Sequence, residues 1–290
     1  MPELPEVETL AKGLQSIVGY KIVRIHFFRS KLRENIPTEK ISKLVTGKRV
    51  VAVSRRGKYL LFTVSDGGKE TTNVTLISHL GMSGVFCLLR QNKDSQKDFQ
   101  SHTHFYIKLN KGDHSLTCAY SDPRRFGRLS FMEGSDNSLE NHRFLKGLGI
   151  EPLEVSAEVL ASHMAAKAKS KRAHIKGFLL NQGVVAGIGN IYASESLYVS
   201  GIMPNRVVST LKTGEWQRLA LGIQSVLQKA IELGGSTLKD FHHLDGQQGY
   251  FSLNAQVYMR DGQACEICGG TVKKSYQQNR STYYCVTCQH

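Results

Sequence analysis

The second residue of the chain is a proline whose amine could act as a nucleophile. Met1 precedes a small residue, so we expect its removal, which would leave Pro2 with a free secondary amine. An α-amino group has a pKa of about 7.7–8.0, against about 10.4 for lysine, so far more of it is unprotonated at neutral pH. Such an amine can condense with an aldehyde-like sugar carbon to an iminium, which acidifies the neighbouring proton and permits β-elimination of a phosphate. Glu3 stands beside the amine, where a general acid would be needed.

The same segment is also typical of a helix start. Pro5 suits a first helical position, and the nearby glutamates suit a first turn, where they face the helix dipole. Apolar residues then recur at helical spacing, which predicts a helix over residues 5–18 that stops at Gly19. Taken alone, this structural explanation is the stronger one, so a chemical role for Pro2 needs support from the rest of the chain.

The cysteines at the end of the chain have the spacing of metal ligands. They form two CxxC pairs, Cys265 with Cys268 and Cys285 with Cys288, separated by sixteen residues. This pattern predicts one structural zinc ion held by four thiolates, and disulfides are the weaker alternative in a reducing compartment. A module this short cannot bury a large hydrophobic core, so zinc binding would be needed to stabilise its fold. Cys87 and Cys118 lie inside β-rich runs and are interpreted as buried apolar residues.

The charge of the chain indicates a polyanionic partner. The 290 residues carry a formal charge of +14, with a pI near 9.5, and this favours nucleic acid over solubility alone. Residues 167–176, KAKSKRAHIK, are rich in Lys and Arg, although a solvated helix face would explain them equally well. The segment Gly187-Ile188-Gly189-Asn190 opens a predicted helix, and its amides predict an anion site. It lacks the third glycine of a dinucleotide fingerprint.

Two short segments could enter a base stack. The run Asp122-Pro123-Arg124-Arg125-Phe126-Gly127 is a predicted turn with two cations and an aromatic residue. Met82, in HLGMSG, could be a second wedge. Architectural proteins insert such side chains between bases. Each signal is weak by itself, because a lone Met or Phe is usually part of a core.

The elements that must position these residues change character along the chain. Short β-rich runs follow residue 20, namely YKIVRIHFF, RVVAV, KYLLFTV, NVTLISHL, HFYIKL, SLTCAY and RLSFM. Such runs suggest a sandwich or barrel. From about Asn137 the pattern is helical, most clearly over residues 215–233. We therefore expect an α+β multidomain protein with a β-rich domain at 1–136, a helical domain at 137–255 and a zinc module at 256–290.

Taken together, these segments resemble the bacterial formamidopyrimidine-DNA glycosylases. The similarity is carried in order by PELPEVET, RRGKYL, HLGMSG, DPRRFG, IKGFLLNQGVVAGIGNIYASE, GGSTLKDF, DGQQGYF, QVYMRDG and the cysteine module with Arg280-Ser281-Thr282. These motifs cover nearly the whole chain and are highly specific. The resemblance implies an N-terminal helix plus β-sandwich, a helix–two-turns–helix domain and a C-terminal four-cysteine zinc finger. It also implies a bifunctional glycosylase and AP lyase that removes oxidised purines, such as 8-oxoguanine and formamidopyrimidines, and cuts by β,δ-elimination.

The resemblance also implies roles for individual residues. The catalytic set would be Pro2 as nucleophile, Glu3 as proton donor or relay, Glu6 as support, Lys58 in β-elimination and Arg280 in δ-elimination or phosphate binding. The wedge that fills the gap left by the everted nucleotide would be Met82, Arg124 and Phe126. Further DNA contacts would be Lys176 and Asn190 near the lesion, His102 and Lys171 elsewhere, and Lys239 near the loop over the flipped base.

Three alternatives make different predictions. An endonuclease VIII-type enzyme would prefer oxidised pyrimidines, and the Met82 and DPRRFG wedge argues against that branch. A non-catalytic zinc-finger DNA-binding protein would explain the charge and the cysteines but neither the Pro2-Glu3 start nor Lys58. A metal-dependent nuclease would need a catalytic cluster with ligand spacing, and the sequence offers only the bare pair His242-His243.

The partner and compartment follow from the same observations. We expect damaged double-stranded DNA as the partner and a monomer as the active form. The N-terminus lacks the basic start and apolar core of a secretory signal, and no run approaches the roughly 20 apolar residues of a membrane span. A cytoplasmic, nucleoid-associated location in a bacterium is therefore expected.

Overall fold

The structure, a computed structural model, describes residues 1–67, 73–89, 101–134, 140–235 and 254–290. The described chain forms two compact units. The first holds Met1–Pro2 and Glu6–Lys146, and the second holds Glu3–Pro5, Gly147–Ser236 and Tyr250–His290. The division into three domains at 1–136, 137–255 and 256–290 stays a prediction.

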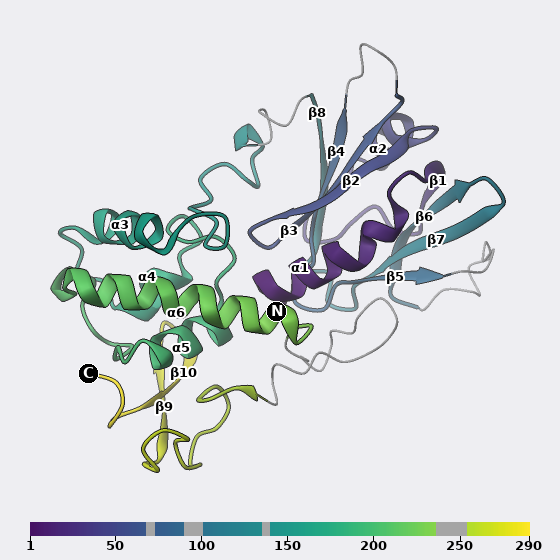
Figure 1. Cartoon of the computed structure of the whole chain (residues 1–290). Helices are drawn as coiled ribbons and strands as arrows, with labels where there is room; N and C mark the ends of the chain where they lie inside the picture. The colour runs from purple at the N-terminus through teal and green to yellow at the C-terminus, as the bar shows by residue number, and fades with distance from the viewer. Residues whose placement is uncertain (68–72, 90–100, 135–139, 236–253) are drawn as a thin grey trace. The chain divides into compact units, whose positions relative to one another are not determined.

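The first unit is built on antiparallel strands (Figure 1). They are β1 (Lys21–Phe27), β2 (Arg49–Arg56), β3 (Tyr59–Ser65), β4 (Val74–His79), β5 (Val85–Leu89), β6 (Thr103–Lys111), β7 (His114–Ser121) and β8 (Arg128–Glu133). Their order is β5-β7-β6-β1-β2-β3-β4-β8. Strands β1 and β2 share a single register pair, Lys21 with Arg49, whereas their other neighbours pair over most of their lengths. The strands therefore form two halves, which are the layers of the predicted β-sandwich.

One apolar core fills this sandwich. Helix α1 (Leu4–Gly13) contributes Val7 and Leu10, and the 3₁₀ turn η1 (Leu14–Ile17) contributes both of its end residues. The predicted helix over 5–18 is therefore an α-helix that tightens into a 3₁₀ turn, as helix C-termini often do. Inward residues of the strands complete the core, including Phe62 and Phe86, whose ring centroids lie 5.4 Å apart.

Two elements of this unit are weakly marked in the sequence: helix α2 lies outside the predicted runs, and strand β5 was expected only as the β-rich run around Cys87. Helix α2 (Thr38–Val45) is short and buries Ile41 and Val45. Strand β5 buries Phe86 but leaves most of its other side chains partly exposed. Both elements carry too few buried residues for periodicity to reveal them, and tertiary packing selects their conformation.

The second unit is helical in its middle part. Its elements are α3 (Ala157–Ala168), α4 (Ile175–Leu180), α5 (Asn190–Val199), the 3₁₀ turn η4 (Val208–Thr210) and α6 (Thr213–Glu232). The apolar stripe predicted over 215–233 is confirmed, because its members from Trp216 to Ile231 are buried on one side of α6. Helix α6 packs on α3 and α5.

The C-terminal part of this unit is a two-stranded ribbon of β9 (Val272–Gln277) and β10 (Arg280–Cys285). The turn between the strands uses Gln278 and Asn279, both at positive φ (50° and 58°), as a two-residue type I′ hairpin requires. The side chain of Gln289 joins this part to the segment that follows α5. The buried Gln289 amide donates to the carbonyl of Ile202 and its carbonyl oxygen accepts from the amide of Cys285, each at 2.8 Å.

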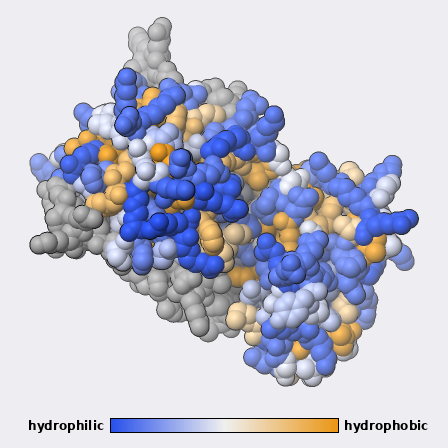
Figure 2. All heavy atoms as spheres, turned by 180° about the vertical axis from the view of Figure 1, so that it is seen from behind, coloured by the Kyte–Doolittle hydropathy of each residue, from blue (hydrophilic) through white to orange (hydrophobic). Residues whose placement is uncertain are grey.

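One face of the molecule is largely polar. On the face drawn in Figure 2, hydrophilic side chains dominate and hydrophobic atoms occur in small scattered groups. None of the helices in the described ranges combines the length and the apolar character that a membrane crossing demands.

Candidate active site and metal centre

The carboxylate of Glu3 lies at the N-terminus of helix α5. Its Oε2 accepts a hydrogen bond from the main-chain N–H of Gly189 at 2.7 Å, and its Oε1 accepts from Ile191 at 3.1 Å. A longer bond of 3.4 Å comes from Tyr192. The free N–H groups and the dipole of a helix N-terminus both stabilise negative charge. Glu3, which is 3% exposed, is thus held in one orientation by main-chain donors.

Two glycines allow the chain start to approach this helix. Gly187 has a φ of +86°, and a Cβ there would lie 2.6 Å from the Cβ of Leu4. A Cβ on Gly189 would lie 2.3 Å from the Glu3 carboxyl carbon, closer than any real contact. The helix begins at Asn190, as predicted from these glycines. The predicted anion site is therefore present, and the anion it holds is the carboxylate of Glu3.

The other residues proposed for catalysis in the first unit are buried. Pro2 lies two residues before helix α1, and Glu6, in the first turn of this helix, is fully buried. Lys58 occupies the two-residue turn between β2 and β3 and is only 6% exposed. Gly57, the other turn residue, has a φ of +56°, a conformation that glycine adopts without cost.

His79, at the end of β4, pairs with Tyr59, the neighbour of Lys58 in the sequence, and was not singled out from the sequence. Burial, together with the positive charges of Lys58, Arg128 and Arg33, lowers the pKa of His79 to about 4. The ring is therefore neutral at pH 7. Its Nδ1 accepts a hydrogen bond of 2.9 Å from the main-chain N–H of Gly81, next to Met82. His79 thus links the surroundings of Lys58 to the turn that carries Met82.

The predicted wedge residues lie on two turns of the first unit. Phe126 is 42% exposed, which is unusual for a phenylalanine, and the Arg124 guanidinium carbon lies 5.2 Å from the centroid of its ring. Met82 is partly exposed on the turn between β4 and β5. These three side chains therefore remain available for contact with a ligand.

Lys176 and Asn190 converge on the start of β10 in the second unit. The Lys176 ammonium donates to the carbonyl of Ser281 and to the hydroxyl of Thr282, each at 2.8 Å. The Asn190 amide donates to the same carbonyl at 3.0 Å. Burial and the nearby Arg280 lower the pKa of Lys176 to about 8, against an opposing effect of Glu3. Both side chains thus support the strand on which the exposed Arg280 lies.

The remaining predicted DNA contacts are exposed where they are described. His102 precedes β6 and Lys171 follows α3, and both are solvent-exposed. The Lys171 ammonium also lies 5.8 Å from the centroid of the Phe178 ring. Lys239 falls outside the described residues. No hydrogen bond among the described residues identifies a role for His102 or Lys171, and their predicted roles rest on the resemblance.

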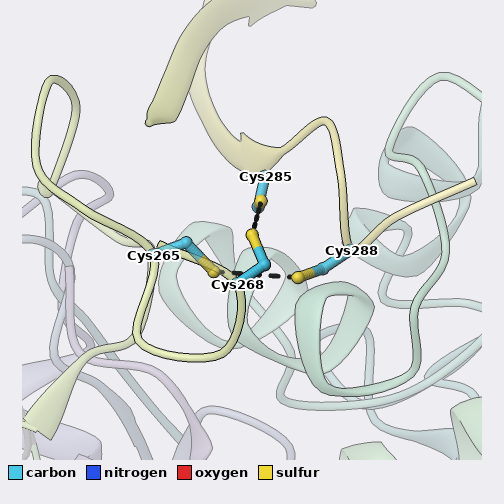
Figure 3. A group of neighbouring side chains, drawn as sticks. All are labelled: Cys265, Cys268, Cys285 and Cys288. Carbon is cyan, nitrogen blue, oxygen red and sulfur yellow. Dashed lines mark hydrogen bonds between the residues drawn. The ribbon is translucent and has the colours of Figure 1, made fainter. Parts of the chain in front are cut away.

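The four terminal cysteines come together as their spacing predicts. In Figure 3 the thiols of Cys265 and Cys268, from one loop, face those of Cys285 and Cys288. All four sulfur atoms lie within 4.8 Å of one another, and the two closest pairs are 3.5 and 3.7 Å apart. A tetrahedral site with Zn–S bonds of about 2.3 Å places sulfur atoms about 3.8 Å apart. The residues therefore fit a four-thiolate metal ion such as zinc.

Helix α5 supports this metal centre through two residues that sequence reasoning missed. The Tyr198 hydroxyl lies 3.0 Å from the sulfur of Cys265. Burial raises the pKa of Cys265, but hydrogen bonds from Tyr198 and from nearby main-chain amides lower it to about 6, which favours the thiolate. The buried Glu195 carboxylate accepts three main-chain hydrogen bonds of 2.8–3.0 Å from residues 256–258. No local pattern marks either residue, because their partners lie far along the chain.

Comparison with known proteins agrees with this architecture. Residues 1–129 match the family profile "Formamidopyrimidine-DNA glycosylase N-terminal domain", and residues 148–242 match "Formamidopyrimidine-DNA glycosylase H2TH domain". The formamidopyrimidine-DNA glycosylases of Brucella ovis and Nitrosococcus oceani are each 40% identical to this chain, and the alignments cover 100% of both chains.

Solved structures show the same similarity. A Lactococcus lactis Fpg variant in complex with Fapy-dG DNA superposes with a TM-score of 0.84 and is 32% identical over 100% of both chains. The wild-type enzyme with oxidised-pyrimidine DNA gives a TM-score of 0.83, again at 32% identity over 100% of both chains. The predicted fold and the predicted resemblance are confirmed, and this chain belongs to the formamidopyrimidine-DNA glycosylase family.

Proposed function

We propose that this chain is a base-excision repair enzyme, a DNA glycosylase with AP lyase activity that acts on damaged double-stranded DNA. Its substrates would be oxidised purines, including 8-oxoguanine and formamidopyrimidines. The observation that carries the proposal is the Glu3 carboxylate, which follows Pro2 in the sequence and is held at the N-terminus of α5. The chain aligns with a formamidopyrimidine-DNA glycosylase over 100% of both sequences. Relatives of known structure have been solved with Fapy-dG DNA and with abasic-site DNA.

Pro2 would be the nucleophile once Met1 is removed. Its nitrogen would attack C1′ of the damaged nucleotide, the C1′–N bond to the base would break, and the departing base would take up a proton. The C1′–O4′ bond would then break, with a proton taken up by O4′, and leave an iminium between C1′ and the Pro2 nitrogen. The iminium would make the C2′ proton acidic, and loss of that proton would expel the 3′ phosphate. Glu3 would hold or relay the proton, since its carboxylate is rigidly positioned beside the amine. Glu6 would support this segment from the first turn of α1.

Lys58 and Arg280 would serve the elimination steps and bind phosphate. Lys58 is presented by a tight hairpin, and Arg280 by the start of β10, so both cations are attached to regular structure. A buried ammonium and an exposed guanidinium are suited to different tasks. The Lys58 ammonium is a compact charge on a flexible stem, whereas the planar Arg280 guanidinium can bind phosphate through two donors.

The wedge residues would keep the DNA base stack open, and basic residues would bind the DNA backbone. Met82, Arg124 and Phe126 would fill the space of the everted nucleotide, and unstacking that nucleotide costs about a few kcal/mol. Lys176, Asn190, His102 and Lys171 would contact the backbone, and Lys239 would lie near the flipped base. The four cysteines would bind one structural zinc ion, which would keep the β9–β10 ribbon folded.

Borohydride trapping tests the nucleophile. The protein would be incubated with a duplex carrying one 8-oxoguanine, in EDTA and without added magnesium, and borohydride would reduce the iminium to a stable adduct. The adduct should map to the N-terminal peptide without Met1. Pro2→Gly keeps a free amine and should retain some trapping, whereas an N-terminal tag should abolish it. If Lys58→Ala abolishes trapping and the tag does not, Lys58 is the nucleophile.

A further inference from the structure

The turn that carries Phe126 and the turn that carries Met82 share a buried carboxylate. Asp122 is fully buried, and its two oxygens serve different partners. Its Oδ1 accepts a hydrogen bond of 2.6 Å from the hydroxyl of Ser83, which follows Met82. Its Oδ2 accepts a hydrogen bond of 2.8 Å from the main-chain N–H of Gly127, which follows Phe126. One side chain therefore bridges the two turns.

The same carboxylate lies at the base of an exposed loop. Residues 123–126 are exposed, whereas Asp122 and Gly127, on either side of them, are buried. The Asp122 carbonyl oxygen accepts from the main-chain N–H of Arg125 at 3.2 Å, which closes the turn. Arg125 has a φ of 56°, in the left-handed region that residues other than glycine rarely adopt. The loop is thus held in one conformation by contacts at its base.

The two turns also touch through their main chains. Gly81 has a φ of +67°, and a Cβ there would lie 2.5 Å from the nitrogen of Gly127 and from the carbonyl carbon of Phe126. The Ser83 hydroxyl, which donates to Asp122, accepts in turn from the main-chain N–H of Arg124 at 3.2 Å. The main chains of the two turns are in contact at Gly81, which has no side chain to separate them. A shift of one turn would therefore displace the other.

We propose that Asp122 is a positioning residue that fixes the relative placement of Met82 and Phe126, so that both enter the base stack as one wedge. The inference rests on the proposed function of these two side chains in DNA. A preorganised wedge has its own side chains ordered before DNA binds, so less entropy is lost when the nucleotide is everted. The buried carboxylate makes charge-assisted hydrogen bonds, which are stronger than neutral ones and hold the geometry.

Asp122→Asn tests this role with a nearly isosteric change. An amide has one acceptor oxygen and one NH2 donor, so it can accept from Gly127 only while its NH2 faces Ser83, and neither contact is then made by a charged carboxylate. Single-turnover excision of 8-oxoguanine from a fully paired duplex should fall about tenfold. The same lesion in single-stranded DNA needs no wedge, and its excision should change less than about twofold. A 2-aminopurine base next to the lesion should report slower opening of the stack.

Double-mutant cycles separate positioning from general stability. In a Met82→Ala, Phe126→Ala background, Asp122→Asn should reduce duplex excision less than about twofold further, because no wedge remains to be placed. Ser83→Ala removes the Ser83–Asp122 hydrogen bond but keeps the Gly127–Asp122 bond. It should therefore reduce excision from the duplex less than Asp122→Asn does, again with little effect on single-stranded DNA. Thr63→Val removes a buried hydroxyl of the same sandwich, bonded to Thr75 at 3.3 Å, and is the matched control.

The outcomes distinguish this inference from the proposed function. An equal loss from Asp122→Asn on duplex and single-stranded substrates, or an unchanged loss in the wedge-deleted background, would overturn the positioning role. If Phe126→Ala and Met82→Ala leave duplex excision unaffected, the wedge itself is wrong and the inference falls with it. Should Asp122→Asn not fold, Ser83→Ala decides the question by the same comparison.

Discussion

The carboxylate of Glu3 and the main-chain N–H of Gly189, 186 positions apart in the sequence, are joined by a hydrogen bond of 2.7 Å. This bond attaches the residue beside the proposed nucleophile to the start of a helix in the middle of the chain. The proton transfer proposed for Glu3 therefore depends on the main chain of residues 187–190, which positions its carboxylate.

Replacing the Glu3 carboxylate should separate base release from strand cleavage. Glu3→Gln leaves the Pro2 amine intact but cannot relay a proton, so excision of 8-oxoguanine should fall about 10²- to 10⁴-fold. Cleavage of a preformed abasic site should persist, because the base has already left. Gel assays of both substrates under single-turnover conditions measure this, and a parallel loss on both would contradict the role.

Displacing Glu3 without altering it should have a similar effect. Gly189→Ala would place a Cβ 2.3 Å from the Glu3 carboxyl carbon, so that the carboxylate must move. Excision should fall as it does in Glu3→Gln. Gly214→Ala is the matched control, because a Cβ on that helical glycine meets nothing within 4 Å. If both alanine variants behave alike, the placement of Glu3 is unimportant.

The metal centre should contain one zinc ion per chain, and its retention should depend on Tyr198. Cys268→Ser should remove the metal and DNA binding. Tyr198→Phe deletes the hydroxyl 3.0 Å from the Cys265 sulfur, and such outer-shell changes weaken metal affinity by about 10- to 100-fold. Zinc release to a colorimetric chelator measures this, with the exposed Tyr276→Phe as control. Freshly purified active protein without zinc would refute the assignment.

Low pH should destabilise the first unit through His79. The folded pKa of about 4 lies below the unfolded value of 6.5, so the unfolded state binds more protons between these values. Stability contributed by the neutral ring is present above pH 6.5 and is lost as the pH falls towards 4. Allowing for partial exposure, the loss is on the order of 2 kcal/mol. The His79 ring resonance in NMR spectra should not titrate between pH 8 and 5.5, and a midpoint near 6.5 would disprove this.

DNA binding should depend strongly on salt, and Arg280 should account for part of that dependence. If Arg280 neutralises one phosphate, Arg280→Ala should reduce the slope of log affinity against log salt by about 0.9. The weakening should be similar for damaged and undamaged duplexes. Arg218→Ala, which removes an exposed arginine of α6 without a proposed DNA contact, is the control. An unchanged slope in Arg280→Ala would exclude a phosphate contact.

Much of this architecture follows from local patterns in the sequence. The apolar stripe of α6 and most strands of the sandwich are periodic, and burying one side of each element stabilises that conformation in any compact fold. The CxxC pairs likewise predicted the four-thiolate centre, because two residues between cysteines bring two sulfur atoms onto one turn. Helix α2 and strand β5 are short and weakly patterned, so periodicity did not reveal them.

The surroundings of the functional residues were decided by tertiary structure. Nothing near Asp122 in the sequence indicates that it binds Ser83, and nothing near Tyr198 indicates Cys265 as its partner. The sequence alone indicated an anion site at the N-terminus of α5, and only the fold shows that the Glu3 carboxylate occupies it. A buried polar group must find a partner somewhere, but which one it finds depends on how the elements pack. Residue types therefore determined which chemistry is available, and packing determined which groups hold those residues in position.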